Sequence, residues 1–525
     1  MTRYAIVADL NRCVGCQTCT AACKHQNATA PGVMWRKVLD FEAGTFPDVR
    51  RAFVPVGCMH CDEPPCLDVC PSTATKKRAD GIVTIDYDIC IGCAYCAVAC
   101  PYDARYRVDE ARPAYNGKGR MRHEALREDP ARLGVAQKCT FCVDRIDAGI
   151  KAGLVPGTDP EATPACVNSC IAQALTFGDI DDPDSNVSKL LRENRTFQMH
   201  EELGTGPGIF YLWDRGRNGV VPDQSPELVP DPVGLDRVSP RLQKNWDWRA
   251  AANFVFGGAG TGLMLAAALD GLVDGPSRVL LFLALALVGA GLLCVWLEIG
   301  RPWRFFNVYR HARRSWMTRE ALAALPYFAF GGLGFLLANE WLALIAAGFG
   351  LFFVYAQGRI LHAARGIPTW RSPRIVPLIV LTGLTEGFAA LTIVGPQVGA
   401  GASSSVYAAA MLTLLVALRL AAWRAWRQGL EQEGAPMASL RALDASGLSL
   451  STVNQIAVVA LGVASFVLPG LLPLAGLAAL LTGWAFKYRL VTRAAHMQGY
   501  ALARMPARGG GKAARGIKPG WWRAA

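Results

Sequence analysis

The segment Cys90-Ile-Gly-Cys-Ala-Tyr-Cys-Ala-Val-Ala-Cys-Pro101 decides the fold of the first part of the chain, because its four cysteines follow the spacing C-x2-C-x2-C-x3-C. Three more groups of four cysteines surround it. In chain order the groups are Cys13, Cys16, Cys19 and Cys23; Cys58, Cys61, Cys66 and Cys70; Cys90, Cys93, Cys96 and Cys100; and Cys139, Cys142, Cys166 and Cys170. Together they hold all but one of the 17 cysteines, the exception being Cys294.

This spacing predicts four [4Fe–4S] clusters in two pairs. A tight C-x2-C-x2-C loop wraps three thiolates round one cubane, and the fourth cysteine, carried into the following helix, ligates the other cluster of the pair. We expect the first group to exchange cysteines with the fourth, and the second with the third. Just before Cys90, the segment Gly81–Asp86 alternates like a short strand. Residues 1–214 are therefore predicted to form an α+β ferredoxin-like domain of two tandem dicluster units.

Structural zinc and disulfide bonds are the alternatives for so many cysteines. Zinc sites usually take four cysteines as two C-x2-C pairs and have no use for a run of four. Disulfides form in oxidising compartments, whereas the first residues of the chain show neither an apolar signal segment nor a twin-arginine signal. Both alternatives are disfavoured. Cys294, alone in an apolar segment, is typical of a small buried hydrophobe.

The chain becomes strongly apolar after about residue 250. Residues 215–245, rich in Pro, Asp and Gly, are predicted to be a linker. Residues 246–496 are predicted to be an all-α polytopic membrane domain of about eight helices, and 497–525 a basic tail. The apolar stretches run approximately 251–272, 279–299, 320–338, 341–361, 375–395, 405–423, 451–468 and 474–491. A re-entrant pair is the alternative for the last two.

Basic residues are concentrated on one side of these stretches. Twenty-three Lys and Arg residues fall in one set of loops and the tail, against Arg278 alone in the opposite loops. By the positive-inside rule the basic side is cytoplasmic. Both termini and the cluster domain are therefore predicted to face the cytoplasm at the inner (plasma) membrane. The asymmetry also explains the net charge of +12 without a nucleic-acid partner, and 52% hydrophobic residues exclude a single soluble globule.

Three glutamates in or beside the apolar stretches are candidate functional groups. Glu298 closes the second stretch, Glu320 opens the third, and Glu386 lies near the middle of the fifth. An ionisable group at membrane depth indicates function by default. For Glu386, a possible proton path and a packing contact both stay open. No histidine occupies the middle of a stretch, so we expect no membrane haem.

Several motifs resemble one known family. Cys58-Met-His-Cys-Asp-Glu-Pro-Pro-Cys and Cys90-Ile-Gly-Cys-Ala-Tyr-Cys resemble the four-cluster electron-transfer subunit of dimethyl sulfoxide reductase-type molybdoenzymes. The later part resembles the membrane anchor subunit of the same complexes. The residues that carry this second resemblance are Gly300-Arg-Pro-Trp-Arg304 with Asn307, Ser315-Trp-Met-Thr-Arg-Glu320, Ile367-Pro-Thr-Trp370 and Thr492-Arg-Ala-Ala495. The chain looks like a fusion of two subunits that are normally separate.

The resemblance implies a quinone site in the anchor near the clusters, with Glu320 at the position of a family glutamate. Many members have a histidine where this chain has Glu298. Because quinol oxidation releases two protons and both glutamates flank one short loop, we expect them to handle quinone protonation. We expect Arg301, Arg304 and Asn307 to orient the quinone carbonyls. Nitrate-reductase relatives have a tryptophan at the position of Cys93, so a complete cubane is expected here.

We therefore expect an electron-transfer and quinone-reactive subunit. It would relay electrons between the membrane quinone pool and a separate molybdopterin catalytic subunit, for sulfoxide or oxyanion reduction or for sulfite oxidation. A redox-driven ion-translocating module, using Glu386 and Lys487, is the first alternative. A membrane-bound redox sensor is the second.

Overall fold

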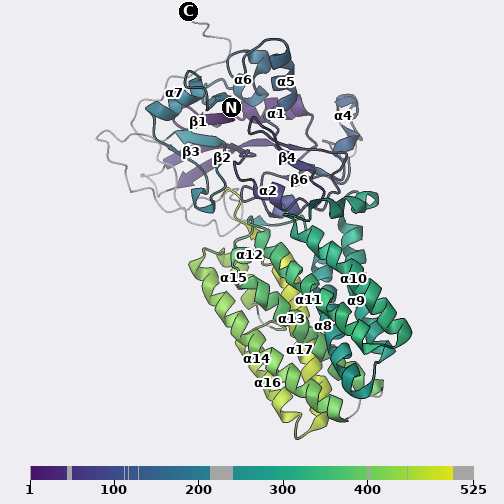
Figure 1. Cartoon of the computed structure of the whole chain (residues 1–525). Coiled ribbons are helices and arrows are strands. Elements are labelled where there is room, and N and C mark those ends of the chain that lie inside the picture. Colours follow the sequence, from purple (N-terminus) through teal and green to yellow (C-terminus); the bar gives the residue numbers. More distant parts are fainter. Residues whose placement is uncertain are drawn as a thin grey trace, which may run out of the picture.

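The computed structural model describes residues 2–43, 50–212 and 241–500, apart from 112, 116–117, 128, 399–401 and 446. A domain of short strands and short helices sits on a bundle of long helices, which lies beneath it in Figure 1. Most of the predicted linker 215–245 and most of the predicted tail 497–525 lie outside the described residues.

A four-stranded sheet organises the first domain. Its order is β8-β1-β10-β9, with β1 parallel to β10 and antiparallel to β8. Two-stranded sheets pair β2 with β3, β4 with β5, β6 with β7 and β11 with β12. The strands are β1 (Tyr4–Asp9), β2 (Arg36–Ala43), β3 (Arg50–Gly57), β4 (Thr75–Lys77), β5 (Val83–Ile85), β6 (Tyr106–Arg107), β7 (Ala136–Gln137), β8 (Leu175–Asp179), β9 (Thr196–Phe197), β10 (Ile209–Leu212), β11 (Arg241–Leu242) and β12 (His496–Met497). The predicted short strand before Cys90 is β5, and the α+β fold class is confirmed.

Short helices connect these strands, and all but α4 and α7 start within the span of one of the four cysteine groups. They are α1 (Thr18–Asn27), α2 (Pro65–Asp68), α3 (Tyr95–Val98), α4 (Arg122–Arg127), α5 (Val143–Lys151), α6 (Ala165–Asn168) and α7 (Asn186–Glu193), with 3-10 turns η1 (Pro130–Arg132), η2 (Pro160–Ala162) and η3 (Glu201–Leu203). The residues just before α1 and α3, Gln17 and Ala94, have left-handed backbones with φ of 60° and 57°. These turns redirect the chain from each cysteine loop into its helix, which carries the last cysteines of the group back into the domain.

The second part of the chain is a helical bundle. Its elements are α8 (Trp248–Asp274), α9 (Arg278–Glu298), η4 (Pro302–His311), α10 (Trp316–Leu337), α11 (Glu340–Ala363), α12 (Pro368–Arg371), α13 (Ile375–Val394), η5 (Gly395–Gln397), α14 (Ala402–Gln432), α15 (Met437–Asp444), α16 (Thr452–Ala464), η6 (Pro469–Leu471) and α17 (Leu472–Thr492). Within the described ranges, 7 helices are long and apolar enough to cross a membrane, and α16 is a shorter apolar helix. The chain is a multi-pass membrane protein.

The two ends of the bundle lie on the same face. Strand β11 precedes α8 and β12 follows α17, and the two strands pair, Leu242 with His496. This arrangement requires an even number of crossings, so α16 supplies the eighth. Its 13 residues span only about 20 Å at 1.5 Å per residue, less than the hydrocarbon core of about 30 Å. The eight predicted stretches thus correspond to seven long helices and one short one.

The two parts of the protein meet backbone to backbone at three glycines. The amide of Gly300, after α9, donates a hydrogen bond of 3.2 Å to the carbonyl of Gly92, in the loop of the third cysteine group. A Cβ atom on Gly300 would lie 2.2 Å from the carbonyl oxygen of Gly134, and one on Gly92 would lie 2.0 Å from the same oxygen. No side chain fits between these backbones. The contact holds the third cysteine group against the membrane helices.

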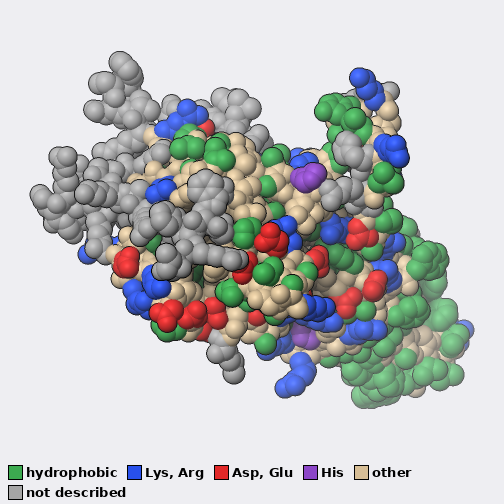
Figure 2. All heavy atoms as spheres, turned by 90° about the horizontal axis from the view of Figure 1, so that it is seen from above, with side chains coloured by type: hydrophobic (Ala, Val, Ile, Leu, Met, Phe, Trp, Pro, Cys, Tyr) green, Lys and Arg blue, Asp and Glu red, His purple; other side chains and the backbone are tan. Residues whose placement is uncertain are grey.

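Charged and hydrophobic side chains are distributed according to the division between the cluster domain and the helical bundle. Seen from above the cluster domain, charged side chains of both signs cover that domain, and hydrophobic side chains gather where the bundle projects beyond it (Figure 2). The twenty-three basic residues that the sequence assigns to the loops and tail include Arg419 and Lys487, and for these two the assignment is wrong. Both side chains are fully buried inside the bundle.

Candidate functional site

The cysteines gather in sets that each draw on two groups. The electrostatic neighbours of Cys61 are Cys58, Cys66 and Cys100; those of Cys93 are Cys70, Cys90 and Cys96; those of Cys23 are Cys139, Cys142 and Cys166; and those of Cys19 include Cys13, Cys166 and Cys170. In each of the first three sets the last cysteine of one group joins the first three of its partner, and near Cys19 the last cysteine of the fourth group, Cys170, joins Cys13 of the first. Among the described residues, no three potential ligands converge as a single metal ion requires. The four thiols around a cubane are necessarily further apart than the ligands of a single metal ion.

Buried cations supply a test of whether clusters fit these sets. Arg36, on β2, is fully buried, and none of its three guanidinium nitrogens has a hydrogen-bond partner among the described residues. Burial would lower the pKa of Arg36, but the nearby thiolates of Cys166, Cys139 and Cys19 outweigh it and raise the pKa. A buried charge needs a compensating charge. Sulfur atoms of an anionic cluster would provide it.

Two further buried cations lie beside the cysteine groups, Arg105 near the second and third and Lys138 near the second and fourth. The guanidinium of Arg105 is buried and donates to the sulfur of Cys66 at 2.9 Å and to Thr75 at 3.1 Å. Lys138 is also fully buried and donates to the carbonyls of Val83 and Cys139. Burial lowers the pKa of Lys138, although the Cys58 thiolate opposes this. Thiolates surrounded by buried cations fit iron–sulfur clusters better than neutral free thiols.

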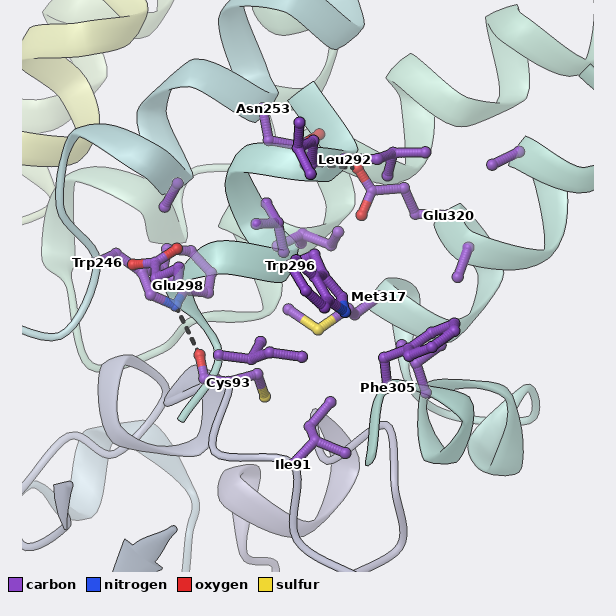
Figure 3. Close-up of a pocket in the computed structure, with 18 of the residues that line it drawn as sticks. Ile91, Cys93, Trp246, Asn253, Leu292, Trp296, Glu298, Phe305, Met317 and Glu320 are labelled. Carbon is purple, nitrogen blue, oxygen red and sulfur yellow. Dashed lines mark hydrogen bonds between the residues drawn. The ribbon is translucent and has the colours of Figure 1, made fainter. Parts of the chain in front are cut away.

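A cavity of about 370 Å³ lies where the cluster domain meets the bundle (Figure 3). Its walls come from the third cysteine loop and from α8, α9, η4, α10 and α11, and most of them are apolar. The polar groups include Cys93, Asn253, Glu298, Tyr309 and Glu320. Glu298 and Glu320 lie on either side of Trp296, with Cys93 below them in the view of Figure 3. The cavity therefore brings the predicted cluster ligand Cys93 and two carboxyl groups to one apolar space.

Glu320 is held by a chain of hydrogen bonds. Its side chain is 5% exposed, and its Oε1 accepts a hydrogen bond of 3.1 Å from the Asn253 amide on α8. Gln357, on α11, in turn donates to the backbone carbonyl of Asn253 at 3.0 Å. A Cβ atom on Gly257 would lie 2.6 Å from the amide nitrogen of Gln357, so only glycine leaves room for it. Three helices thus fix the position of this one carboxyl group.

Glu298 is held from the other side of the cavity. It is 6% exposed, and its Oε1 accepts a hydrogen bond of 3.2 Å from the backbone amide of Asp247, the N-cap residue of α8. The same turn carries Trp246, whose ring lines the cavity and stacks on Trp370 at 5.9 Å. The N-terminus of α8 therefore positions both the second carboxyl group and an aromatic wall.

The structure places three predicted quinone-binding residues elsewhere. Arg301 donates to the carbonyl of Leu133 at 2.9 Å, Arg304 to Tyr87 at 2.5 Å, and Asn307 to Ile89 at 3.1 Å. These three side chains bind backbone of the cluster domain, and the cavity is lined instead by neighbours of theirs such as Phe305 and Val308. Their contacts fasten η4 to the loop of the third cysteine group.

Glu386 lies apart from this cavity, in a second buried polar group. Its Oε2 accepts a hydrogen bond of 2.6 Å from Lys487 on α17, and both side chains are fully buried. Glycines make room for the pair, because a Cβ atom would lie 2.2 Å from the Lys487 nitrogen at Gly258 and 2.6 Å from Glu386 Oε1 at Gly483. Arg419 is also fully buried and donates to Gln455, Thr482 and the carbonyl of Ala479.

Comparison with known proteins assigns both parts of the chain. Residues 49–124 match the model of the 4Fe-4S dicluster domain, and residues 263–472 match that of the DMSO reductase anchor subunit. The chain is 42% identical over 225 residues to a subunit of the selenate reductase of Mesobacillus selenatarsenatis, covering 40% of this chain and 72% of the relative. It belongs to the dimethyl sulfoxide reductase family of iron–sulfur and membrane-anchor subunits.

Other relatives in this family are named for different compounds. The chain is 38% identical over 255 residues to a subunit of the sulfite dehydrogenase of Allochromatium vinosum, covering 45% of this chain and 90% of the relative. It is 39% identical over 214 residues to a subunit of the tetrathionate reductase of Salmonella typhimurium, covering 40% and 72%. The predicted family and the electron-transfer role are confirmed. These relatives match less than half of the chain, and the anchor model matches its second part.

Several residues of the site were not predicted from the sequence. Arg36 and Arg105 lie outside the cysteine spacing, and nothing in their sequence surroundings distinguishes them from surface arginines. Asn253 and Gln357 are polar residues within apolar stretches, and polar residues at membrane depth indicate function. The position of Asn253 and Gln357 within apolar stretches could therefore have identified them as candidate site residues.

Proposed function

We propose that the cavity between Cys93 and Glu320 binds the ring of a membrane quinone. The observation that carries this proposal is that one mostly apolar cavity is lined by both a cluster ligand and a buried carboxyl group. A small-molecule site is typically an apolar cavity with a few placed polar groups. A quinone ring needs such walls, and its reaction needs a nearby electron carrier and a proton acceptor.

The two carboxyl groups match the proton chemistry of a quinol. Oxidation of a quinol releases two electrons and two protons, and Glu320 and Glu298 provide two acceptors on opposite sides of the cavity. Asn253 orients the Glu320 carboxyl group by donating to Oε1. Arg301, Arg304 and Asn307 act as positioning residues, because their bonds to the cluster-domain backbone fix the wall that contains Cys93.

We infer that the sixteen grouped cysteines hold four [4Fe–4S] clusters, with each pair of groups exchanging its last cysteines. When bound, such clusters supply one-electron transfer between the cavity and the far side of the domain. Arg36, Arg105 and Lys138 supply buried positive charge to balance them. A separate molybdopterin subunit would carry the terminal reaction, either reduction of a sulfoxide or oxyanion or oxidation of sulfite. The names of the relatives, which include a selenate reductase and a sulfite dehydrogenase, support both directions.

The substitution Glu320→Gln tests the quinone site. Glutamine keeps the size and hydrogen bonding of the side chain but removes the proton acceptor. Quinone-linked turnover of the assembled complex should fall by about 10²-fold, the lower range for loss of a general base, with iron content and dye-linked activity of the catalytic subunit unchanged. Glu340→Gln, at the opposite end of the bundle at the start of α11, is the matched control. Normal quinone kinetics in Glu320→Gln would refute the assignment.

A second function, redox-driven ion translocation, is favoured by the Glu386–Lys487 pair. Burying an ion pair completely inside a membrane bundle costs desolvation free energy. Such a pair therefore indicates a structural or transport role. Glu386 Oε1 has no hydrogen-bond partner among the described residues. Proton uptake and release on each side of proteoliposomes during quinone turnover would separate the two functions. A ratio of protons to electrons beyond that of quinone chemistry, lost in Glu386→Gln, would support translocation.

A further inference from the structure

A second cavity, of about 740 Å³, opens at the boundary between the cluster domain and the bundle. It shares no lining residue with the cavity at Glu320. Its walls come from α2 and η3 of the cluster domain, from the start of α10, and from the ends of α11 and α12. The charged and ionisable lining residues are Asp68, Glu202, Arg314, Arg319, Arg359, His362, Arg365 and Arg371.

Positive charge exceeds negative charge in this cavity. Five arginines face two carboxylates, and both carboxylates already have partners. Asp68 pairs with Arg314 at 2.9 Å, and Glu202 lies 3.3 Å from the ring of His200. Glu202 also acts electrostatically on Arg371, so three of the five guanidinium groups, those of Arg319, Arg359 and Arg365, are left without a carboxylate among the lining residues.

Two nitrogen atoms in the cavity wall also lack hydrogen-bond partners. The Nε atom of Arg359 and the Nδ1 atom of His362 are buried and have no partner among the described residues. Arg359 lies 4.7 Å from the centre of the Trp316 ring, and Arg319 lies 4.2 Å from it. Both guanidinium groups therefore contact the same ring. An anion with several oxygen atoms would supply the missing hydrogen bonds and balance the excess of positive charge.

The position of the cavity indicates where the anion comes from. The start of α10 and the end of α11 lie at the face of the bundle that contacts the cluster domain (Figure 1). From Trp316 an aromatic strip runs into the membrane, with Tyr355 at 5.6 Å and Phe352 at 6.2 Å from Tyr355. Tyr355 is 36% exposed and Phe352 is 43% exposed. This strip offers a surface for an acyl chain directly below the arginines.

We propose that this cavity binds the phosphate group of an anionic phospholipid from the leaflet on the cluster-domain side. Basic residues on that face are expected from topology alone. Dispersed loop charges, however, would not converge on one hollow or leave buried nitrogens unpaired. Basic pockets between membrane helices bind anionic lipid head groups. Inorganic phosphate shares the same chemistry and is the alternative source of the anion.

Lipid binding by the delipidated full chain tests the proposal. Native mass spectrometry would follow binding of phosphatidylglycerol and of phosphatidylcholine, and a separate titration would follow inorganic phosphate. The wild type should bind phosphatidylglycerol at least tenfold more tightly than phosphatidylcholine. The variants Arg359→Gln and Arg319→Gln/Arg359→Gln should lose that preference. The matched control is Arg313→Gln, which removes an exposed charge in the turn before α10 that does not line the cavity.

Iron content and the melting temperature show whether each variant is folded. If the double variant does not assemble, the single Arg359→Gln variant is used for the binding test. Arginine-dependent binding of inorganic phosphate without a preference for phosphatidylglycerol would support the phosphate site but overturn its assignment to a lipid. Equal lipid binding by wild type and variants, with no arginine-dependent phosphate binding, would overturn the proposal entirely.

Discussion

The indole nitrogen of Trp246 donates a hydrogen bond of 3.0 Å to the backbone carbonyl of Cys93. Trp246 lies just before the first membrane helix, and Cys93 belongs to the third cysteine group. Both residues also line the cavity at Glu320. This single bond therefore links the loop of a proposed cluster, the wall of the proposed quinone site and the start of the bundle. Because the two subunits are joined in one chain, the loop, the cavity wall and the start of the bundle keep fixed positions relative to one another.

The glycine contact between the two parts can be tested by adding one methyl group. In Gly300→Ala the new Cβ atom would lie 2.2 Å from the carbonyl oxygen of Gly134, so the backbones must separate. We expect a loss of about 1–3 kcal/mol of stability, typical of overpacking, and slower quinone-linked turnover at normal iron content. In Gly332→Ala, on α10, the Cβ atom would meet nothing within 4 Å. Equal behaviour of the two variants would show that close approach of the backbones is unimportant.

Metal content tests the cluster assignment. The anaerobically purified protein should contain about sixteen iron atoms, from four cubanes, without stoichiometric zinc. Cys93→Ser should lose or convert one cluster, while the clusters of the first and fourth groups remain, because their ligand set contains no residue near Cys93. Cys294→Ser, at a cysteine outside the four groups, should keep the full iron content. A three-iron signal in the untreated wild type would contradict a complete cubane at Cys93.

Local patterns in the sequence predicted the cysteine groups and the two carboxyl groups. Cysteine spacing is a local constraint imposed by the cubane, so the groups could be recognised without any tertiary information. Glu298 and Glu320 flank one short loop, so their proximity also followed from chain connectivity. Both predictions needed only short-range geometry.

The remaining features depend on tertiary packing. The side chains of Arg301, Arg304 and Asn307 are directed to the cluster domain by docking contacts that no sequence pattern specifies. Asn253 reaches Glu320 from a helix 67 positions away in sequence. Lys487 lies near the end of the last predicted apolar stretch, where a basic residue normally faces the cytoplasm, so the sequence counts it among the cytoplasmic basic residues. Its actual partner, Glu386, is 101 residues distant.

Reporter fusions test the orientation. A green fluorescent protein domain fused after Ala525 should fluoresce, because the basic loops and the cluster domain are proposed to be cytoplasmic. Alkaline phosphatase fused after Asp274, at the end of α8, should be active because that end lies on the opposite side of the membrane. Phosphatase activity from a fusion after Ala525 would instead place the clusters on the periplasmic side.

The Glu386–Lys487 pair makes a prediction about stability that is independent of ion transport. Removing one partner leaves the other charge buried and uncompensated, which costs about 3–5 kcal/mol in comparable sites. Both Glu386→Gln and Lys487→Met should therefore lower the free energy of unfolding strongly. The double variant replaces the pair by two uncharged side chains and should lose clearly less than the sum of the two single effects, because contacting residues are coupled.

Unfolding titrations of the purified protein in detergent, with helix content as the signal, would measure this cycle. Asn454→Ala on α16 serves as a control for the loss of a polar side chain in the same part of the bundle, since its side-chain amide donates to nearby backbone carbonyls, those of Gly447 and Ser449, and to no other described residue. Additive effects of the two charged positions would mean that the 2.6 Å contact carries no coupling energy. Strong coupling would show that the pair acts as one unit, which both a structural role and a proton path require.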